Sequence, residues 1–305
     1  MKTILIFGGT GFIGLSLAKH LKEQGLQPIL IARNKPTQSI EFDFEQWDAV
    51  RVGDWKKRLN NSLAVVNLAG KSVDCIKNPE NCDLILRSRV DSTLAIGKAF
   101  LEVENPPKIW IQMSTAHIYG DPPSQVCTEE STTGYGLAPI VGKAWEAAFN
   151  KAKPENVRGV ILRTSFVIGK NGGALTSLKR IVKLGLGGTA GKGKQGMSWI
   201  HEYDMNEIIF QAITNNSYEG IYISSAPNPV SNKHFMKSLR KTMGIPIGLA
   251  APEMMIRIGA KLVFNTDPEL VLYGRYVKSE KLDLIGYKFK YANLEPALEH
   301  LIKGE

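Results

Sequence analysis

The chain has 305 residues, of which 43% are hydrophobic and 22% charged, so it is long and apolar enough for a large core and is not a disordered chain. Three cysteines without paired spacing, Cys75, Cys82 and Cys127, exclude a disulfide framework or zinc site and predict a reducing cytoplasm. No apolar run approaches the roughly 20 residues that span a bilayer, so no membrane contact is expected. The net charge of +9 favours an anionic partner.

Strands and helices alternate along the first 169 residues. Strands are predicted over 2–8, 27–33, 63–70, 108–115 and 158–169, and helices over 15–25, 83–103 and 140–152. The strands are continuously apolar, which is typical of a parallel sheet covered on both faces. The sequence therefore predicts a doubly wound α/β (Rossmann) fold, with only short strand-like pieces over residues 34–62.

The regular alternation ends after residue 170. A Gly-rich loop between two helical segments comes first, then a strand, a Pro-rich turn and a helix capped by Ser231, and the last sixty residues are expected to be helical. We predict a Rossmann domain over residues 1–169 and a smaller, mostly helical substrate lobe over 170–305. The lobe is interleaved with the sheet around residues 199–226.

Glycines fill the turn between the first strand and the first helix, in "GGTGFIG". Missing side chains at such a turn let backbone N–H groups approach a pyrophosphate at the helix N-terminus. A purely structural Gly-rich turn is the alternative. The predicted contacts to a dinucleotide are Gly8, Gly9, Thr10, Gly11, Phe12, Ile13 and Gly14.

The second strand indicates which dinucleotide is bound. It ends at Ala32 and Arg33, and no acidic residue follows until Glu41. An acid at this place binds a ribose 2′-OH, whereas an arginine accepts a 2′-phosphate. Arg33, with Lys35 assisting, therefore predicts NADP rather than NAD, unless Arg33 is a surface residue without a role.

The segment "NLAG" ends the next strand, at the carboxyl edge where cofactors lie in this architecture. Its small residues permit close approach of a ligand to the backbone. The predicted cofactor contacts here are Asn67, Leu68, Ala69 and Gly70.

Several motifs resemble the extended branch of the short-chain dehydrogenase/reductase superfamily: "GGTGFIG", "NLAG" and "STAHIYGD". "SRVDST", "AWE", the stretch 172–204 and "GYKFKYANLEPAL" are similar to an atypical, largely uncharacterised "epimerase family protein" group within it. The resemblance covers essentially the whole chain. It implies a Rossmann domain with a C-terminal domain of unknown function over about residues 250–300.

The resemblance also implies a catalytic Tyr and a Lys four residues later, and this chain lacks both. Aligned on Glu146, the two positions hold Ala138 and Gly142. Lys143 is one position off, about 100° around a helix, and Tyr135 precedes the helix. The absence is shared by the resembled group.

Two residues are candidates to replace the missing pair. Thr115 occupies the superfamily's Ser or Thr position, which helps to bind a substrate carbonyl or hydroxyl, although a strand-end hydroxyl bonded to the backbone is an equal alternative. Tyr119 is a weaker candidate, since it is more often a packing residue.

His201 in "SWIHEYD" is the second candidate. It is a substitute acid, paired with Asp204, or part of a structural strand-to-helix junction. Arg89 in "SRVDST" is left unassigned, between the cofactor edge and a pairing with Asp91.

A basic stretch without acidic side chains, residues 156–201, contains the Gly-rich loop. Lys192, Lys194 and Gln195 in this loop are predicted to bind an anionic substrate, with a flexible surface loop as the alternative. A nucleic-acid binder is not expected, because no recognised module accompanies the charge.

The function that the sequence favours is an NADP(H)-binding oxidoreductase or epimerase that acts on a small anionic or sugar-like molecule. A non-catalytic NADP(H) sensor or scaffold with a protein partner is the alternative. The sequence leaves the oligomeric state open.

Overall fold

A computed structural model describes residues 2–36, 41–122, 125–262 and 266–304 of the chain. Residues 37–40, inside the weakly patterned segment 34–62, lie outside these ranges. So do residues 263–265 of the predicted C-terminal domain.

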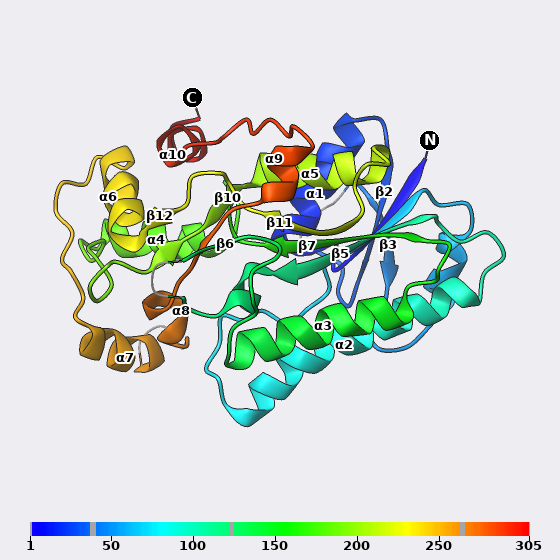
Figure 1. The fold of residues 1–305 in the computed structure, drawn as a ribbon, viewed down its shortest axis with the longest axis horizontal. Coiled ribbons are helices and arrows are strands. Elements are labelled where there is room, and N and C mark those ends of the chain that lie inside the picture. The colour runs from blue at the N-terminus through cyan, green and yellow to red at the C-terminus, as the bar shows by residue number, and fades with distance from the viewer. Residues whose placement is uncertain (1, 37–40, 123–124, 263–265, 305) are drawn as a thin grey trace.

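A seven-stranded sheet forms the centre of the molecule (Figure 1). Its order is β11-β7-β5-β4-β1-β2-β3, and every neighbouring pair is parallel. The strands are β1 (Thr3–Phe7), β2 (Gln27–Ala32), β3 (Asp43–Gln46), β4 (Ala64–Asn67), β5 (Ile109–Thr115), β7 (Arg158–Thr164) and β11 (Gly220–Ser224). The predicted doubly wound fold is thereby confirmed. The chain runs outward in opposite directions from β1 and β4, so a topological switch point lies between these two strands.

Helices cover both faces of this sheet. In Figure 1, α1 (Phe12–Glu23) and α5 (Glu202–Thr214) lie on one face, and α2 (Pro79–Leu101) and α3 (Leu137–Ala152) lie on the other. Each face therefore has its own apolar cluster, one containing Ile4 and Leu17, the other Phe7 and Trp110. Helix α2 begins four residues earlier than predicted because the Asn78 side chain accepts a hydrogen bond from the Asn81 N–H and Pro79 suits the first turn.

The strand predicted over residues 158–169 is two strands. β7 remains in the large sheet, while β8 (Phe166–Ile168) leaves it and pairs with β10 (Trp199–His201). The break falls at Ser165, whose N–H and hydroxyl both donate to the carbonyl of Ser224. The chain thus passes from the sheet layer into the C-terminal lobe at this residue.

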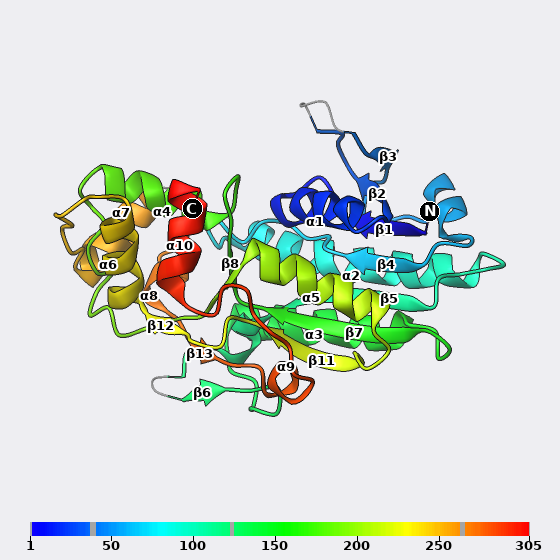
Figure 2. The same ribbon diagram turned by 90° about the horizontal axis from the view of Figure 1, so that it is seen from above.

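The lobe packs against one end of the sheet layer (Figure 2). Its helices are α4 (Ala174–Lys183), α6 (Asn232–Thr242), α7 (Glu253–Leu262), α8 (Glu269–Leu272) and α10 (Leu294–Lys303). Helix α9 (Glu280–Leu284) instead packs beside β11, with Leu282 in the core cluster of the sheet layer. Leu175, Trp199, Phe235 and Leu298 form part of the lobe's buried apolar cluster. The lobe therefore has a core of its own.

Short strands and turns connect the lobe to the sheet layer. They are β6 (Val126–Cys127), β9 (Gly196–Met197), β12 (Val230–Ser231) and β13 (Tyr276–Val277), with the 3₁₀ helix η2 (Ala116–Tyr119). The other 3₁₀ helix, η1 (Asp54–Leu59), belongs to the sheet layer, where it packs against α2. β13 pairs in parallel with β6. The C-terminal region is mostly helical, as predicted, and the two residues of β13 add a short strand to it, whose partner lies 150 residues earlier in the chain.

Two buried carboxylates fix the C-terminal segment. The Asp204 carboxylate accepts hydrogen bonds from the N–H groups of Lys290 at 2.8 Å and Tyr291 at 3.0 Å. Glu129 accepts from the N–H of Ile223 at 2.9 Å and of Glu280 at 3.0 Å. The lobe is thus tied to the sheet layer by charge-assisted bonds as well as by apolar packing.

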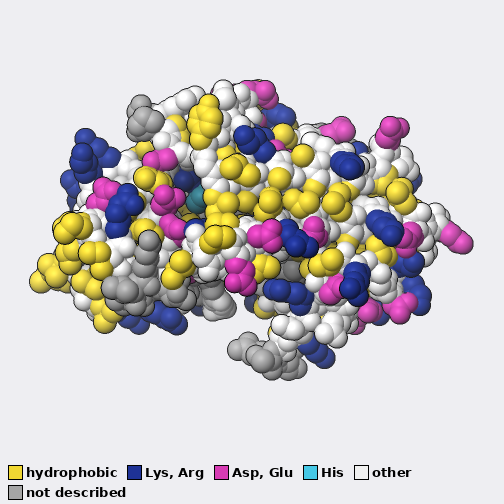
Figure 3. Space-filling view, turned by 90° about the horizontal axis from the view of Figure 1, so that it is seen from below, with side chains coloured by type: hydrophobic (Ala, Val, Ile, Leu, Met, Phe, Trp, Pro, Cys, Tyr) yellow, Lys and Arg dark blue, Asp and Glu magenta, His cyan; other side chains and the backbone are white. Residues whose placement is uncertain are grey.

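The face that carries α2 and α3 shows a band of apolar side chains in Figure 3, and more of them gather at the far end of the lobe, over α7. Leu101 of α2, Ile140 of α3 and Met254 of α7 are among the exposed apolar side chains of these elements. Among the residues that the structure describes, no helix is both long and apolar enough to cross a membrane.

Candidate functional site

The Gly-rich turn is closed by backbone contacts that leave no room for side chains. A Cβ on Gly14 would lie 2.6 Å from the Gly9 backbone, and one on Gly9 would lie 2.7 Å from the carbonyl oxygen of Ile6. Gly8 has a φ of +73°, and its Cβ would lie 2.9 Å from the backbone of Leu68. Three of the glycines are therefore required by the fold itself, and they press the turn against the "NLAG" segment.

Gly11 is different. It is exposed, its φ is −77°, and a Cβ there would lie 3.4 Å from the nearest backbone oxygen, an ordinary contact. It is the N-cap of α1, without a side chain to accept the first N–H groups of the helix, and no acidic residue follows in the first turn. These N–H groups form an anion-binding position at the end of β1.

Phe12 and Ile13 contribute backbone at this helix start. The Phe12 ring packs away from the turn, since Cβ atoms on Gly169 and Gly172 would lie 2.4 and 2.7 Å from it. Thr10 is half-buried within the turn. The side chain of Phe12 thus joins the sheet layer to the loop that follows β8.

The ends of β2 and β4 flank the turn. Arg33 follows β2 and is exposed, so its guanidinium can reach a ligand beyond the strand. Asn67 at the end of β4 is fully buried, and its amide bonds Thr93, Gln112 and the N–H of Ala69. Its side chain therefore shapes the "NLAG" segment and leaves the exposed Gly70 to face a ligand.

Thr115 ends β5 and is half-buried. Its hydroxyl oxygen accepts a hydrogen bond from the His117 N–H at 3.1 Å, which caps η2. Thr115 thus makes the bond to the backbone that is the alternative to a role in substrate binding. The hydrogen of its hydroxyl group remains available to a substrate oxygen.

His117 follows Thr115 by two residues and interacts with the charge of Arg275, and neither residue was among the predicted site residues. Burial, together with the charge of Arg275, lowers the pKa of His117 to about 3, so its imidazole is neutral at pH 7. Arg275 is 8% exposed and donates to the carbonyl of Gly120 at 2.7 Å. His117 was visible in "STAHIYGD", but no local signal links it to an arginine 158 positions further along.

The two positions that a catalytic Tyr and Lys would occupy have no reactive group. Gly142 is buried, and a Cβ there would lie 3.1 Å from the side chain of Ile118. Lys143 is exposed, and Tyr135 is 96% exposed. Neither side chain substitutes for the missing pair in this arrangement.

A buried ion pair lies beneath this region. Arg163 of β7 donates to both carboxylate oxygens of Glu146 on α3, at 2.9 and 2.8 Å. The Ser114 hydroxyl donates to Glu146 at 2.6 Å, and Arg163 also donates to the Tyr119 hydroxyl at 2.8 Å. Burial raises the pKa of Tyr119 to about 12 despite the nearby Arg163, so Tyr119 is a neutral packing residue.

His201 is 1% exposed and lies in a buried cluster of aromatic rings. Its Nδ1 accepts the Tyr203 N–H at 2.9 Å as the cap of α5, and its Nε2 lies 3.1 Å from Nδ1 of His300. Burial and the neighbouring His300 lower its pKa to about 3. Because Asp204 bonds other residues, the structure does not form the His201–Asp204 acid/base pair. This sealed position does not suit the proton donor that the sequence suggested.

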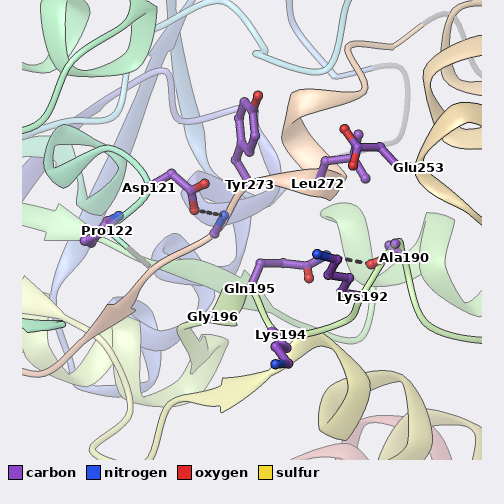
Figure 4. Close-up of a pocket in the computed structure, with 12 residues that line it drawn as sticks. Asp121, Pro122, Ala190, Lys192, Lys194, Gln195, Gly196, Glu253, Leu272 and Tyr273 are labelled. Carbon is purple, nitrogen blue, oxygen red and sulfur yellow. Dashed lines mark hydrogen bonds between the residues drawn. The ribbon is translucent and has the colours of Figure 1, made fainter. Parts of the chain in front are cut away.

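The Gly-rich loop of the lobe lines a cavity of about 280 Å³ (Figure 4). Lys192 and Lys194 border it and are exposed, as expected for an anion site. The Gln195 amide instead donates to the carbonyls of Ala190 and Val271, so it stabilises the loop conformation.

Two carboxylates, Asp121 and Glu253, line the same cavity. In Figure 4 an oxygen of Asp121 bonds the N–H of Gly274, at 2.8 Å. Figure 3 shows a hollow between the sheet layer and the lobe with both acidic and basic side chains around it. The cavity therefore offers a mixed set of donors and acceptors, which suits a polar molecule with hydroxyl groups as well as an anion.

Fold and site together define a nucleotide-binding α/β protein, in which the ligand position is the carboxyl edge around the switch point. Residues 4–223 match the family described as "NAD dependent epimerase/dehydratase family", and the chain belongs to this family. Residues 251–301 match "Domain of unknown function (DUF1731)".

The chain is similar over almost its whole length to several epimerase family proteins. It is 29% identical to "Epimerase family protein SDR39U1 homolog, chloroplastic" of Arabidopsis thaliana, covering 99% of this chain and 87% of the relative. It is 30% identical to "Epimerase family protein SH2119" of Staphylococcus haemolyticus, covering 99% of each.

Among solved structures, human epimerase family protein SDR39U1, crystallised with NADPH, superposes with a TM-score of 0.88 at 27% identity. The match covers 99% of this chain and 100% of that one. A nucleoside-diphosphate sugar epimerase from Corynebacterium glutamicum gives a TM-score of 0.79 at 26% identity, covering 100% of this chain and 59% of that one.

Proposed function

We propose that the chain binds NADP(H) across the carboxyl edge of its sheet and uses it as an oxidoreductase or epimerase on a small anionic or sugar-like molecule. The observation that carries the proposal is the start of α1, where uncapped N–H groups follow a turn whose glycines are packed backbone to backbone. The similarity to human SDR39U1, crystallised with NADPH, supports it.

The residues present fit this cofactor. The start of α1 suits a pyrophosphate, and the exposed Arg33 suits the 2′-phosphate that distinguishes NADP from NAD. Gly70 leaves the end of the β4 segment open on the other side.

Few side chains of this protein would take part in the proposed reaction. The bound cofactor would supply hydride chemistry. The Thr115 hydroxyl would hold a substrate carbonyl or hydroxyl oxygen, and the neutral His117 with Arg275 would bound that side of the site. Lys192 and Lys194 would attract an anionic group, and Asp121 and Glu253 would accept bonds from hydroxyl groups.

A non-catalytic NADP(H) sensor or scaffold is the second candidate. Two observations favour it. Ala138 and Gly142 stand where the superfamily carries Tyr and Lys, and His201 is buried in the lobe. Such a protein would bind the cofactor and present the resulting surface to a protein partner.

Two measurements separate these candidates. Fluorescence titration with NADPH and with NADH tests the cofactor, and binding of NADH alone would overturn the choice of NADP. Stereospecific loss of label from deuterated NADPH, in the presence of carbonyl compounds, tests the reaction. We expect Thr115→Ala to abolish any such turnover while leaving the NADPH Kd unchanged. Tight NADPH binding without turnover across a broad panel would favour the sensor.

The compartment proposed for this protein is the cytoplasm, because its three cysteines are unpaired in sequence and the structure shows all three as free thiols.

A further inference from the structure

Arg89 of α2 is a half-buried cation without an acidic partner among the residues that the structure describes. Asp91, the partner that the sequence suggested, pairs instead with the exposed Arg87, at 3.4 Å. One nitrogen of Arg89, Nη1, donates to the carbonyl of Ile85 at 2.9 Å. Burial lowers the pKa of Arg89 to about 10, so the surroundings do not compensate its charge.

The guanidinium is held in one place by two neighbours. A Cβ on Gly70 would lie 3.1 Å from the Arg89 Cζ, so a side chain at residue 70 would displace it. The Trp145 ring centroid lies 5.0 Å from the same Cζ, within cation–π range. Trp145 is itself fixed by a hydrogen bond from Nε1 to Thr93 at 3.2 Å.

The remaining donors of the guanidinium are not sealed in the interior. Nε and Nη2 make no hydrogen bond within the described residues, and neither is among the fully buried nitrogens that lack a partner. They therefore face space that solvent or a ligand can reach. A purely structural cation–π contact would not require these donors to remain free.

The position of Arg89 relative to the sheet identifies what reaches it. A dinucleotide whose 2′-phosphate lies by Arg33 at β2 and whose pyrophosphate lies at the start of α1 must place its other half over β4 and β5. Gly8 touches the backbone of Leu68 and Ala69, and Gly70 follows directly. Arg89 thus stands on the β4–β5 side of the pyrophosphate position, opposite to Arg33.

We propose that Arg89 is a binding residue for the nicotinamide half of NADP(H), donating charged N–H bonds to the oxygen atoms of that half's phosphate and ribose. The inference rests on the proposed cofactor binding. It gives the edge of the site a cation at each end, Arg33 for the adenosine half and Arg89 for the nicotinamide half.

The test compares two ligands on the same variant. NADPH contains both halves, whereas 2′,5′-ADP contains the adenosine half alone. We expect Arg89→Gln to weaken NADPH binding about tenfold or more, since hydrogen bonds to charged groups contribute about 1.5–3 kcal/mol, and to leave 2′,5′-ADP binding within about twofold. Isothermal titration calorimetry measures both Kd values.

Two control variants accompany this experiment. Arg87→Gln removes an exposed arginine of the same helix, two residues earlier, and should change neither Kd. Arg89→Lys keeps the charge but lacks the planar fork of donors, and should recover part of the NADPH affinity without restoring it fully.

Each other outcome overturns the inference. Equal weakening of both ligands by Arg89→Gln would show that Arg89 merely supports the fold, and unchanged NADPH binding would show that the cofactor does not touch it. If the unmodified chain bound neither ligand, the cofactor proposal itself would fail, and this inference with it.

Discussion

Two arginines contact adjacent residues of α3 in different ways. The guanidinium of Arg163 bonds the Glu146 carboxylate, whereas that of Arg89 lies against the Trp145 ring. Burial alone would lower the pKa of Arg163, but its bonds and charge interaction with Glu146 raise it above the usual range. Arg89 meets an aromatic ring and a glycine, and burial lowers its pKa. A buried charge that the protein compensates belongs to the fold, whereas one that it leaves uncompensated is available to a ligand.

Removing the partner of the compensated arginine should have the largest effect. Glu146→Ala leaves Arg163 buried without its carboxylate and should lower the free energy of unfolding by about 3–5 kcal/mol. Urea denaturation measures this loss. The control is Glu45→Ala, which removes a carboxylate 2.7 Å from Arg58 on the surface and should cost at most about 1 kcal/mol. Equal losses would mean that the Glu146–Arg163 pair does not support the fold.

Two glycines of the turn between β1 and α1 differ in the same way: Gly14 supports the fold, whereas Gly11 borders the proposed ligand position. Gly14→Ala forces a Cβ to within 2.6 Å of the Gly9 backbone and should destabilise the protein by about 1–3 kcal/mol. Gly11→Ala meets only an ordinary contact, so the protein should stay as stable, within about 1 kcal/mol, while NADPH binds about tenfold more weakly. Thermal unfolding and NADPH titration give the two readouts. Unimpaired NADPH binding by Gly11→Ala would contradict a ligand at this helix start.

The pH dependence of stability tests whether His201 is structural. Its folded pKa of about 3 lies below the usual value near 6.5, so between these pH values the unfolded chain binds a proton that the folded chain excludes. Its contribution is complete above about pH 6.5 and is lost as the pH falls toward 3, by about 2 kcal/mol between pH 6.5 and 5. His300, Lys290 and the Tyr291 ring surround the imidazole.

His201→Asn keeps a side chain that can cap α5 and removes this titration. The variant should therefore lose less stability than the unmodified protein between pH 6.5 and 5, with His117 retaining a similar dependence in both. Urea midpoints at several pH values measure the difference. Parallel curves for the two proteins would mean that His201 titrates normally in the folded state.

The smallest expected effect concerns the arginine at the adenosine end. Arg33→Ala should weaken NADPH binding about five- to tenfold and leave NADH binding nearly unchanged, because only the 2′-phosphate is lost as a partner. The ratio of the two Kd values is the measurement. Equal weakening of both ligands would remove Arg33 from 2′-phosphate recognition.

The sequence predicted the sheet and the turn well because both depend on local patterns. Continuous apolar runs identify strands that are buried on both faces, and glycines at fixed spacing identify a turn that permits no side chains. The division of residues 158–169 into β7 and β8 was missed, since an apolar run does not show with which strand each part pairs.

The catalytic side of the site was predicted less well. His201 and Asp204 lie three residues apart in the sequence, yet their side chains bond different partners, His300 and the segment before α10. Arg275 reaches the neighbourhood of Thr115 from a segment 160 residues further along, and no spacing rule relates them. Contacts of this kind follow from how the lobe docks on the sheet.

The sequence by itself determined the doubly wound sheet, the glycine turn and the absence of the usual Tyr and Lys, because each depends on residue types at short and fixed spacing. The tertiary structure alone decided which charges are compensated. Arg163 pairs with Glu146 on a neighbouring helix, whereas Arg89 lies near Gly70 and the Trp145 ring and keeps donors without a partner in the described residues. The physical reason is that desolvation and pairing depend on distances between segments far apart in the chain, which periodicity does not encode.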